Sequence, residues 1–168
     1  MTENRSQDIQ LIRLAAQVEK DSLQFLDKFI ERAGGSQIIP FLLQVQEEAK
    51  GDLETIESLL SSLESEQGMN DIAGLSLDDY VKELHKKKTE KYYPQTKTKE
   101  LLGDLYNPVR VLGYLAESLN DLADFYSTSA SNIFYENEKS SFISLAAKKK
   151  DRADVVSRKR KEIITRFP

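Results

Sequence analysis

The sequence has no cysteine, no tryptophan and only one histidine, His85. The lack of cysteine excludes disulfide bonds, thiolate metal sites and thiol nucleophiles. A single histidine excludes zinc sites built from several histidines and argues against a Ser/His/Asp triad. No phosphate-binding glycine loop and no dinucleotide-binding motif is present. These absences leave few of the common catalytic or cofactor-binding sites open.

Long apolar runs are also missing, because the uninterrupted apolar stretches are only a few residues long. Such stretches are too short to cross a membrane. Residues 1–5 lack the apolar segment of a signal peptide, so we expect a cytoplasmic protein. The length of 168 residues suits one domain, 1–168, with a single core.

Glycine and proline are scarce, with seven and four residues, which leaves long stretches free to form helices. Apolar side chains recur at helical spacing in these stretches. Gly34 and Gly35 are typical of a helix end, and Asn107 followed by Pro108 is typical of a helix start. The pattern predicts four helices, at about 6–33, 37–65, 108–129 and 132–166.

Residues 67–107 differ from the rest, because three glycines and a proline interrupt the apolar pattern. We predict a long crossover connection here, with short helices at about 77–89 and 97–105. His85 lies in this stretch among several lysines, and we expect it on the surface.

The two halves of the chain match at an offset of 100 residues. Chance alignment of two amphipathic patterns is the alternative, but the same offset holds in both predicted hairpins, which favours duplication. The matched positions are Ala16 and Ala116, Asp21 and Asp121, Phe25 and Phe125, Leu26 and Tyr126, Leu42 and Phe142, Val45 and Leu145, Ile56 and Val156, and Leu63 and Ile163. We therefore predict an all-α, four-helix bundle of two duplicated helical hairpins joined by a long crossover.

Two strings carry a resemblance to a known family. Residues 18–25 read VEKDSLQF, and Asn107-Pro108 is followed at 119–126 by LNDLADFY. They are similar to the first and third helices of the rubrerythrin-like branch of the ferritin-like superfamily. The resemblance implies a ferritin-like bundle over nearly the whole chain.

Members of that family bind two metal ions, usually iron, inside the bundle. Their ligands are a Glu from each of helices one and three and a Glu-x-x-His pair from each of helices two and four. The corresponding positions here are Glu19, Leu119, Ala49 with Asp52, and Lys149 with Arg152. A shift of one residue in the second helix gives Glu48 and Gly51, which still lacks the histidine. At best two of the six ligands remain, so the resemblance supports the architecture and argues against the metal centre.

The two basic residues at these positions would repel a metal ion. We predict that Glu19 and Asp52 face Lys149 and Arg152 across the bundle and that these ion pairs replace the metals. The alternative is that both cations extend toward solvent and that aliphatic side chains close the core.

The function we expect is that of a non-catalytic, ferritin-like bundle without a cofactor, which acts through a protein partner or self-association, a homodimer being one form. The alternative is a dinuclear iron or manganese carboxylate protein, an oxidoreductase or a metal store, that uses Glu19, Glu48 and Asp52. We interpret three aromatic residues at one end of the bundle, Tyr126, Phe134 and Tyr135, as core residues rather than as the lining of a small cavity.

Charge is distributed unevenly. Residues 1–80 hold 16 acidic and six basic side chains, whereas residues 148–168 hold nine basic and three acidic ones. The basic run Arg158-Lys159-Arg160-Lys161 gives a second alternative, a binder of nucleic acid or an anionic surface through the fourth helix. No aromatic residues interleave with these cations, so a solvated face that pairs with the acidic helices is the simpler interpretation.

Overall fold

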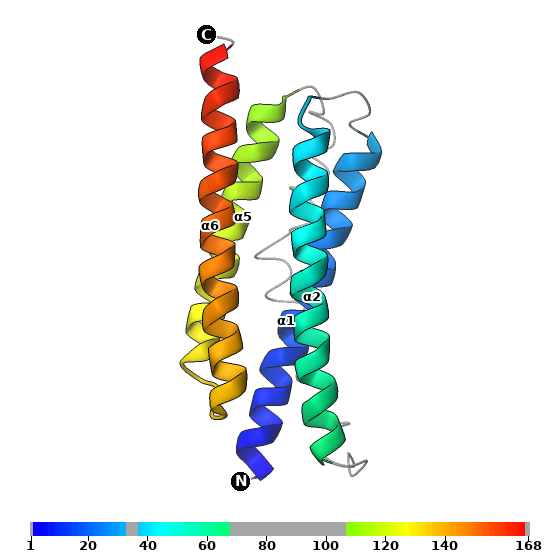
Figure 1. Ribbon diagram of the computed structural model, residues 1–168, viewed down its shortest axis with the longest axis vertical. Coiled ribbons are helices and arrows are strands. Elements are labelled where there is room, and N and C mark those ends of the chain that lie inside the picture. The colour runs from blue at the N-terminus through cyan, green and yellow to red at the C-terminus, as the bar shows by residue number, and fades with distance from the viewer. Residues whose placement is uncertain (1, 33–36, 68–106, 167–168) are drawn as a thin grey trace.

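The computed structural model describes residues 2–32, 37–67 and 107–166, which form four α-helices and contain no strand (Figure 1). The helices are α1 (Thr2–Arg32), α2 (Ile39–Gln67), α5 (Pro108–Ala130) and α6 (Glu136–Arg166). The prediction of an all-α, four-helix protein is confirmed at this level. The predicted helices at 77–89 and 97–105, His85 and the glycine pair at 34–35 lie outside the described residues.

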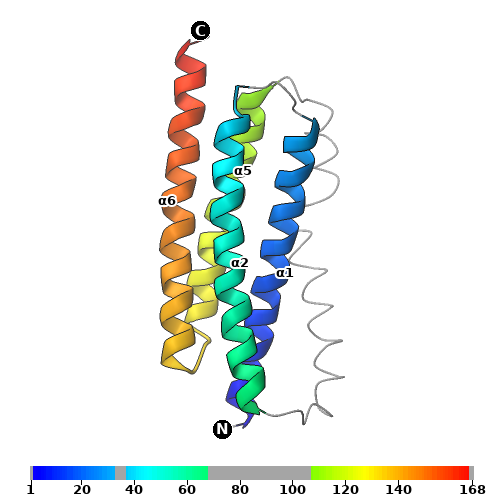
Figure 2. The same ribbon diagram turned by 45° about the vertical axis from the view of Figure 1, so that its right-hand side comes forward.

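The four helices run side by side along one long axis (Figures 1 and 2). α1 packs against α2 and α5 packs against α6, each as an antiparallel pair, and α2 also contacts α6. α1 and α6 run in one direction while α2 and α5 run in the other. The last residue of α2 and the first residue of α5 therefore lie at opposite ends of the bundle. Within the described part of the chain, no helix is apolar over enough length to span a bilayer.

The boundaries of α1, α2 and α5 differ from the predicted ones by at most four residues. α1 begins at Thr2 instead of residue 6, α2 runs two residues later than predicted at both ends, and α5 ends one residue later. Asn107 caps α5 as expected, because its side-chain oxygen accepts a hydrogen bond of 3.2 Å from the backbone N–H of Arg110.

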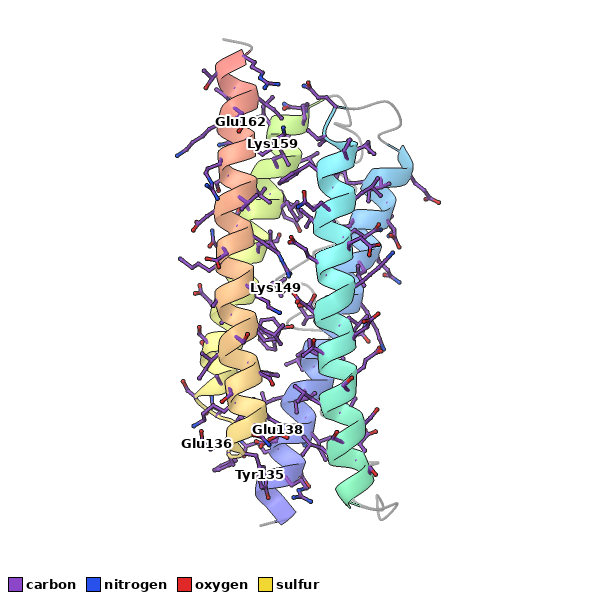
Figure 3. All side chains as sticks on the ribbon, in the orientation of Figure 1. Tyr135, Glu136, Glu138, Lys149, Lys159 and Glu162 are labelled. Carbon is purple, nitrogen blue, oxygen red and sulfur yellow. The ribbon has the colours of Figure 1, made fainter. Side chains whose placement is uncertain are left out.

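The start of α6 was predicted at 132 and is corrected to Glu136. The carboxylate of Asp8, on α1, accepts hydrogen bonds from the backbone N–H groups of Phe134, at 3.0 Å, and Tyr135, at 3.1 Å. These bonds satisfy two backbone donors that precede α6, while the N–H groups of Asn132 and Ile133 bond back to Ser129 and Ala130 at the end of α5. The backbone N–H of Lys139 donates to the carbonyl of Tyr135 at the start of α6. Tyr135 lies beside this first turn (Figure 3).

Residues from all four helices form one apolar core. Phe142 and Tyr126 meet edge to face in it, with ring centroids 5.2 Å apart. Tyr126 is fully buried, as predicted, but the prediction that Phe134 fills the core is wrong, because its side chain is 52% exposed. Tyr135 is half-buried, and the guanidinium of Arg5 lies 5.2 Å from its ring centroid.

Candidate functional site: a buried ion-pair network

Lys149 is the centre of a charged network inside the bundle. Its side chain extends from α6 toward α2 and is buried, with 1% of the side chain exposed (Figure 3). The ammonium nitrogen Nζ lies 2.8 Å from Oε1 of Glu19, 2.9 Å from Oε2 of Glu19 and 3.0 Å from Oδ2 of Asp52. An ammonium group has three N–H donors, so three carboxylate oxygens at this distance can satisfy all of them.

Glu19 connects α1 to the other two helices of the network. It is fully buried, with an exposed fraction of 0%. Besides Lys149, it accepts a hydrogen bond of 2.7 Å from the hydroxyl of Tyr126 on α5. Both carboxylate oxygens of Glu19 are therefore engaged, and the network draws on all four helices: Glu19 on α1, Asp52 on α2, Tyr126 on α5 and Lys149 on α6.

Arg152 forms the outer part of the network. Its guanidinium makes two hydrogen bonds to the carboxylate of Asp52, one from Nη1 to Oδ2 and one of 3.3 Å from Nη2 to Oδ1. Its Nε lies 2.6 Å from Oε2 of Glu48. The side chain of Asp52 is buried, whereas that of Glu48 is 40% exposed. The charge thus extends from the core at Lys149 to the surface at Glu48.

Helical spacing places these residues together. Glu48 and Asp52 are four residues apart on α2, and Lys149 and Arg152 are three apart on α6, so each pair projects from one helix face. The prediction that Glu19 and Asp52 pair with Lys149 and Arg152 is confirmed, and the alternative that both cations extend to solvent is wrong. Two acidic and two basic side chains pair here, and such pairing is the condition for burying charged groups.

The network determines the ionisation of Asp52. Burial by itself raises the pKa of this carboxyl, but the hydrogen bond from Arg152 and the charges of Lys149 and Arg152 outweigh burial and hold the pKa below its usual value of 3.8. Burial by itself lowers the pKa of Arg152. The hydrogen bond and charge of Asp52, together with the charges of Glu48 and Glu19, outweigh burial and hold the pKa above its usual value. Asp52 and Arg152 are therefore a charged pair at neutral pH.

The residues around Lys149 do not fit a dinuclear metal centre. Leu119 and Ala49, at two of the expected ligand positions, are buried and offer no donor atom. Gly51, from the shifted register, is exposed. Glu48, Glu19 and Asp52 are bound to the two cations, and no group of three metal-ligating side chains is found in residues 2–32, 37–67 and 107–166.

The basic run on α6 is partly engaged within the chain. Arg160 folds onto α5, where its Nε donates a hydrogen bond of 3.1 Å to the carbonyl of Val109. Lys159 lies 3.6 Å from Glu162 on the same helix (Figure 3). Arg158 and Lys161 are exposed. Of the four predicted cations, Arg158 and Lys161 are thus the ones exposed to an anionic partner.

The ion-pair prediction lacked two members of the network. Glu48, which pairs with Arg152, was considered only as a metal ligand, and the hydroxyl of Tyr126 had no assigned partner. On α5 Tyr126 continues a buried stripe that includes Leu115, Leu119 and Leu122. A tyrosine on such an aliphatic stripe is itself a signal, because a buried phenol needs a hydrogen-bond partner. Glu19, 107 residues away in the chain, supplies it.

Comparisons of the chain with protein-family models, with curated proteins and with solved structures find no match.

Proposed function

We propose that this chain is a non-catalytic, ferritin-like bundle of the cytoplasm, in which the ammonium of Lys149 stands where relatives of that fold hold metal ions. The observation that carries the proposal is the position of Nζ between Glu19 and Asp52, 2.8 and 3.0 Å from their oxygens. The lysine cation is fixed to the chain, and together with Arg152 it balances the charges of the two carboxylates without any ion from solution.

The path of the chain supports the ferritin-like part of the proposal. Ferritin-like bundles use one long crossover, so that the second and third bundle helices run parallel. α2 and α5 run parallel in this chain (Figure 2). In an up-and-down bundle with short loops these two helices would be antiparallel.

Burial supports the duplication of the hairpins. The apolar positions that match at an offset of 100 residues are buried in both halves: Ala16 and Ala116, Phe25 and Phe125, Leu26 and Tyr126, Leu42 and Phe142, Val45 and Leu145, Ile56 and Val156, and Leu63 and Ile163. Asp52 and Arg152, which pair directly, are also 100 residues apart. Equivalent positions of two hairpins related by an approximate two-fold axis can meet in this way.

The proposal assigns the protein a role in protein contacts. Ile143, Val155 and Ile164 on α6 are large apolar side chains that are between 42% and 56% exposed. Of the two kinds of contact, with another protein or with a second copy, self-association can be measured on the purified chain alone. Sedimentation velocity over a wide concentration range tests it, and a Val155→Lys or Ile143→Lys variant should shift the population toward the monomer. A strictly monomeric chain contradicts this form.

Metal binding tests the central part of the proposal. The purified chain, dialysed against manganese(II) and against iron(II) without oxygen, should retain far less than one equivalent of either metal. Lys149→Glu removes the internal cation and adds a third carboxylate, so this variant should gain manganese(II) binding, while Lys150→Glu, on the exposed side of α6, should not. Stoichiometric metal in the unaltered chain contradicts the proposal.

A further inference from the structure

A pocket lies between α2 and α6, directly outside the ion-pair network. Its volume is about 330 Å³, within the range of small-molecule sites. Apolar side chains from both helices line it, and they are Phe41 and Val45 on α2 and Val155 and Val156 on α6. Small-molecule sites typically combine such an apolar lining with a few placed polar groups.

The polar groups of this pocket are the outer part of the network. Arg152 and Glu48 both line it, joined by the 2.6 Å contact between Nε and Oε2. Lys148 and Asp151 contribute one further charge of each sign from α6. Arg152 is fixed from behind by Asp52, whereas Glu48 is 40% exposed and can leave by a rotation of its side chain.

We infer that the pocket binds a small amphipathic carboxylate, whose apolar body lies among Phe41, Val45, Val155 and Val156 and whose carboxylate takes the place of Glu48 on Arg152. The exchange replaces one carboxylate by another, so the charge next to Arg152 is unchanged and Asp52 keeps its partner. Glu48 then moves into water, where its charge is solvated.

Other ligand classes fit less well. A neutral ligand leaves Glu48 in place and gains only apolar contact. On the α6 wall an organic cation would meet two cations, Lys148 and Arg152, and one carboxylate, Asp151, while the carboxylate of Glu48 is already bound to Arg152. The pocket therefore selects for an anionic head group joined to a short apolar chain.

Octanoate, 1-octanol and octylamine, used below their aggregation concentrations, test the inference on the full chain. Binding is measured by titration calorimetry and by NMR shifts of the Val155 and Val156 methyl groups. Octanoate should bind saturably and more tightly than the other two compounds. Equal binding of 1-octanol and octanoate, tighter binding of octylamine, or no saturable shift with octanoate overturns the inference.

Variants separate the pocket from general surface binding. Glu48→Gln removes the competing carboxylate and should tighten octanoate binding about two- to fivefold, as expected for loss of one half-exposed ion pair. Glu47→Gln is the matched control, because Glu47 is exposed and pairs with Lys50 away from the pocket, and it should change nothing. Lys148→Gln should weaken binding in the otherwise unaltered chain. An affinity that is insensitive to both Glu48→Gln and Lys148→Gln overturns the inference.

Discussion

Lys149 on α6 and Glu19 on α1 form an ion pair of 2.8 Å whose side chains are 1% and 0% exposed. The two residues are separated by 130 positions in the chain. Taking both charges out of water is costly, and the cost is offset only because Asp52 and Tyr126 complete their hydrogen bonds. The pair therefore binds the two helix pairs together in one arrangement.

Lys149→Met should destabilise the fold strongly. The substitution removes the cation and leaves Glu19 as a buried charge with only the hydroxyl of Tyr126 as a partner. Loss of one partner of a buried ion pair costs about 3–5 kcal/mol in the free energy of unfolding. Lys150→Met, at the exposed neighbouring position, should change it by less than about 0.5 kcal/mol. Urea unfolding of both variants measures the difference, and equal effects contradict the role of Lys149.

Removing both charges should recover part of that loss. The double variant Glu19→Leu with Lys149→Met leaves no isolated charge, while Asp52 keeps Arg152. We expect it to be less destabilised than the sum of the two single variants by about 1–3 kcal/mol. Additive effects in this double-mutant cycle would show that Glu19 and Lys149 do not interact as their distance indicates.

Asp52 should make stability depend on acid pH. Because the pKa of Asp52 is lower in the folded chain than its usual value of 3.8, its contribution is fully present above that value and is lost as the pH falls through the folded pKa. Unfolding free energies measured from pH 6 down to pH 2 should therefore fall less steeply for Asp52→Asn than for the unaltered chain. Asp154→Asn, at an exposed position on α6, serves as the control and should leave the slope unchanged.

Tyr114 should make the stability of the fold depend on alkaline pH. Burial, together with the charges of Glu117 and Asp121, raises its pKa to about 12, although the hydrogen bond with Ser118 lowers it. A phenol whose pKa is raised on folding stabilises the chain below pH 10, and this contribution is lost as the pH rises toward 12. Tyr114→Phe should flatten the decline in stability above pH 10, and an unchanged decline contradicts the assignment.

Much of the fold follows from local patterns in the sequence. Helical spacing of apolar residues, together with the Asn107-Pro108 start, located four helices. The ion pairs of Lys149 and Arg152 were predicted from the ligand positions that the family resemblance implied, and not from a local pattern. The contacts that were missed join residues far apart in the chain. Asp8 binds the turn before α6 across 126 residues, and the hydroxyl of Tyr126 binds Glu19 across 107. No local pattern encodes such contacts, because they depend on how the helices are aligned along the bundle.

The role of Asp8 can be tested directly. Asp8→Ala leaves the backbone N–H groups of Phe134 and Tyr135 without their acceptor, and it should cost about 1–3 kcal/mol of stability. Hydrogen exchange at these two amides should become faster, more than at amides in the middle of α6. Unchanged exchange at Phe134 and Tyr135 would show that the Asp8 carboxylate does not hold this turn.

Two glycines provide a matched pair for helix stability. A Cβ on Gly51 would meet nothing within 4 Å, whereas one on Gly113 would lie 3.1 Å from Nε of Arg160. Gly51→Ala should therefore stabilise the chain by about 0.5–1 kcal/mol through helix propensity. Gly113→Ala should gain less, because Arg160 must move away from α5. A larger gain at Gly113 than at Gly51, measured by thermal unfolding, contradicts the close packing of Arg160.

The most direct test of the account is a crystal structure of the chain grown with manganese(II) or iron(II), with anomalous scattering recorded at the metal edge. We predict that Nζ of Lys149 lies within hydrogen-bonding distance of both Glu19 and Asp52 and that no anomalous peak appears between the helices. An anomalous peak held by the oxygens of Glu19 and Asp52, with Lys149 turned away, would contradict this prediction.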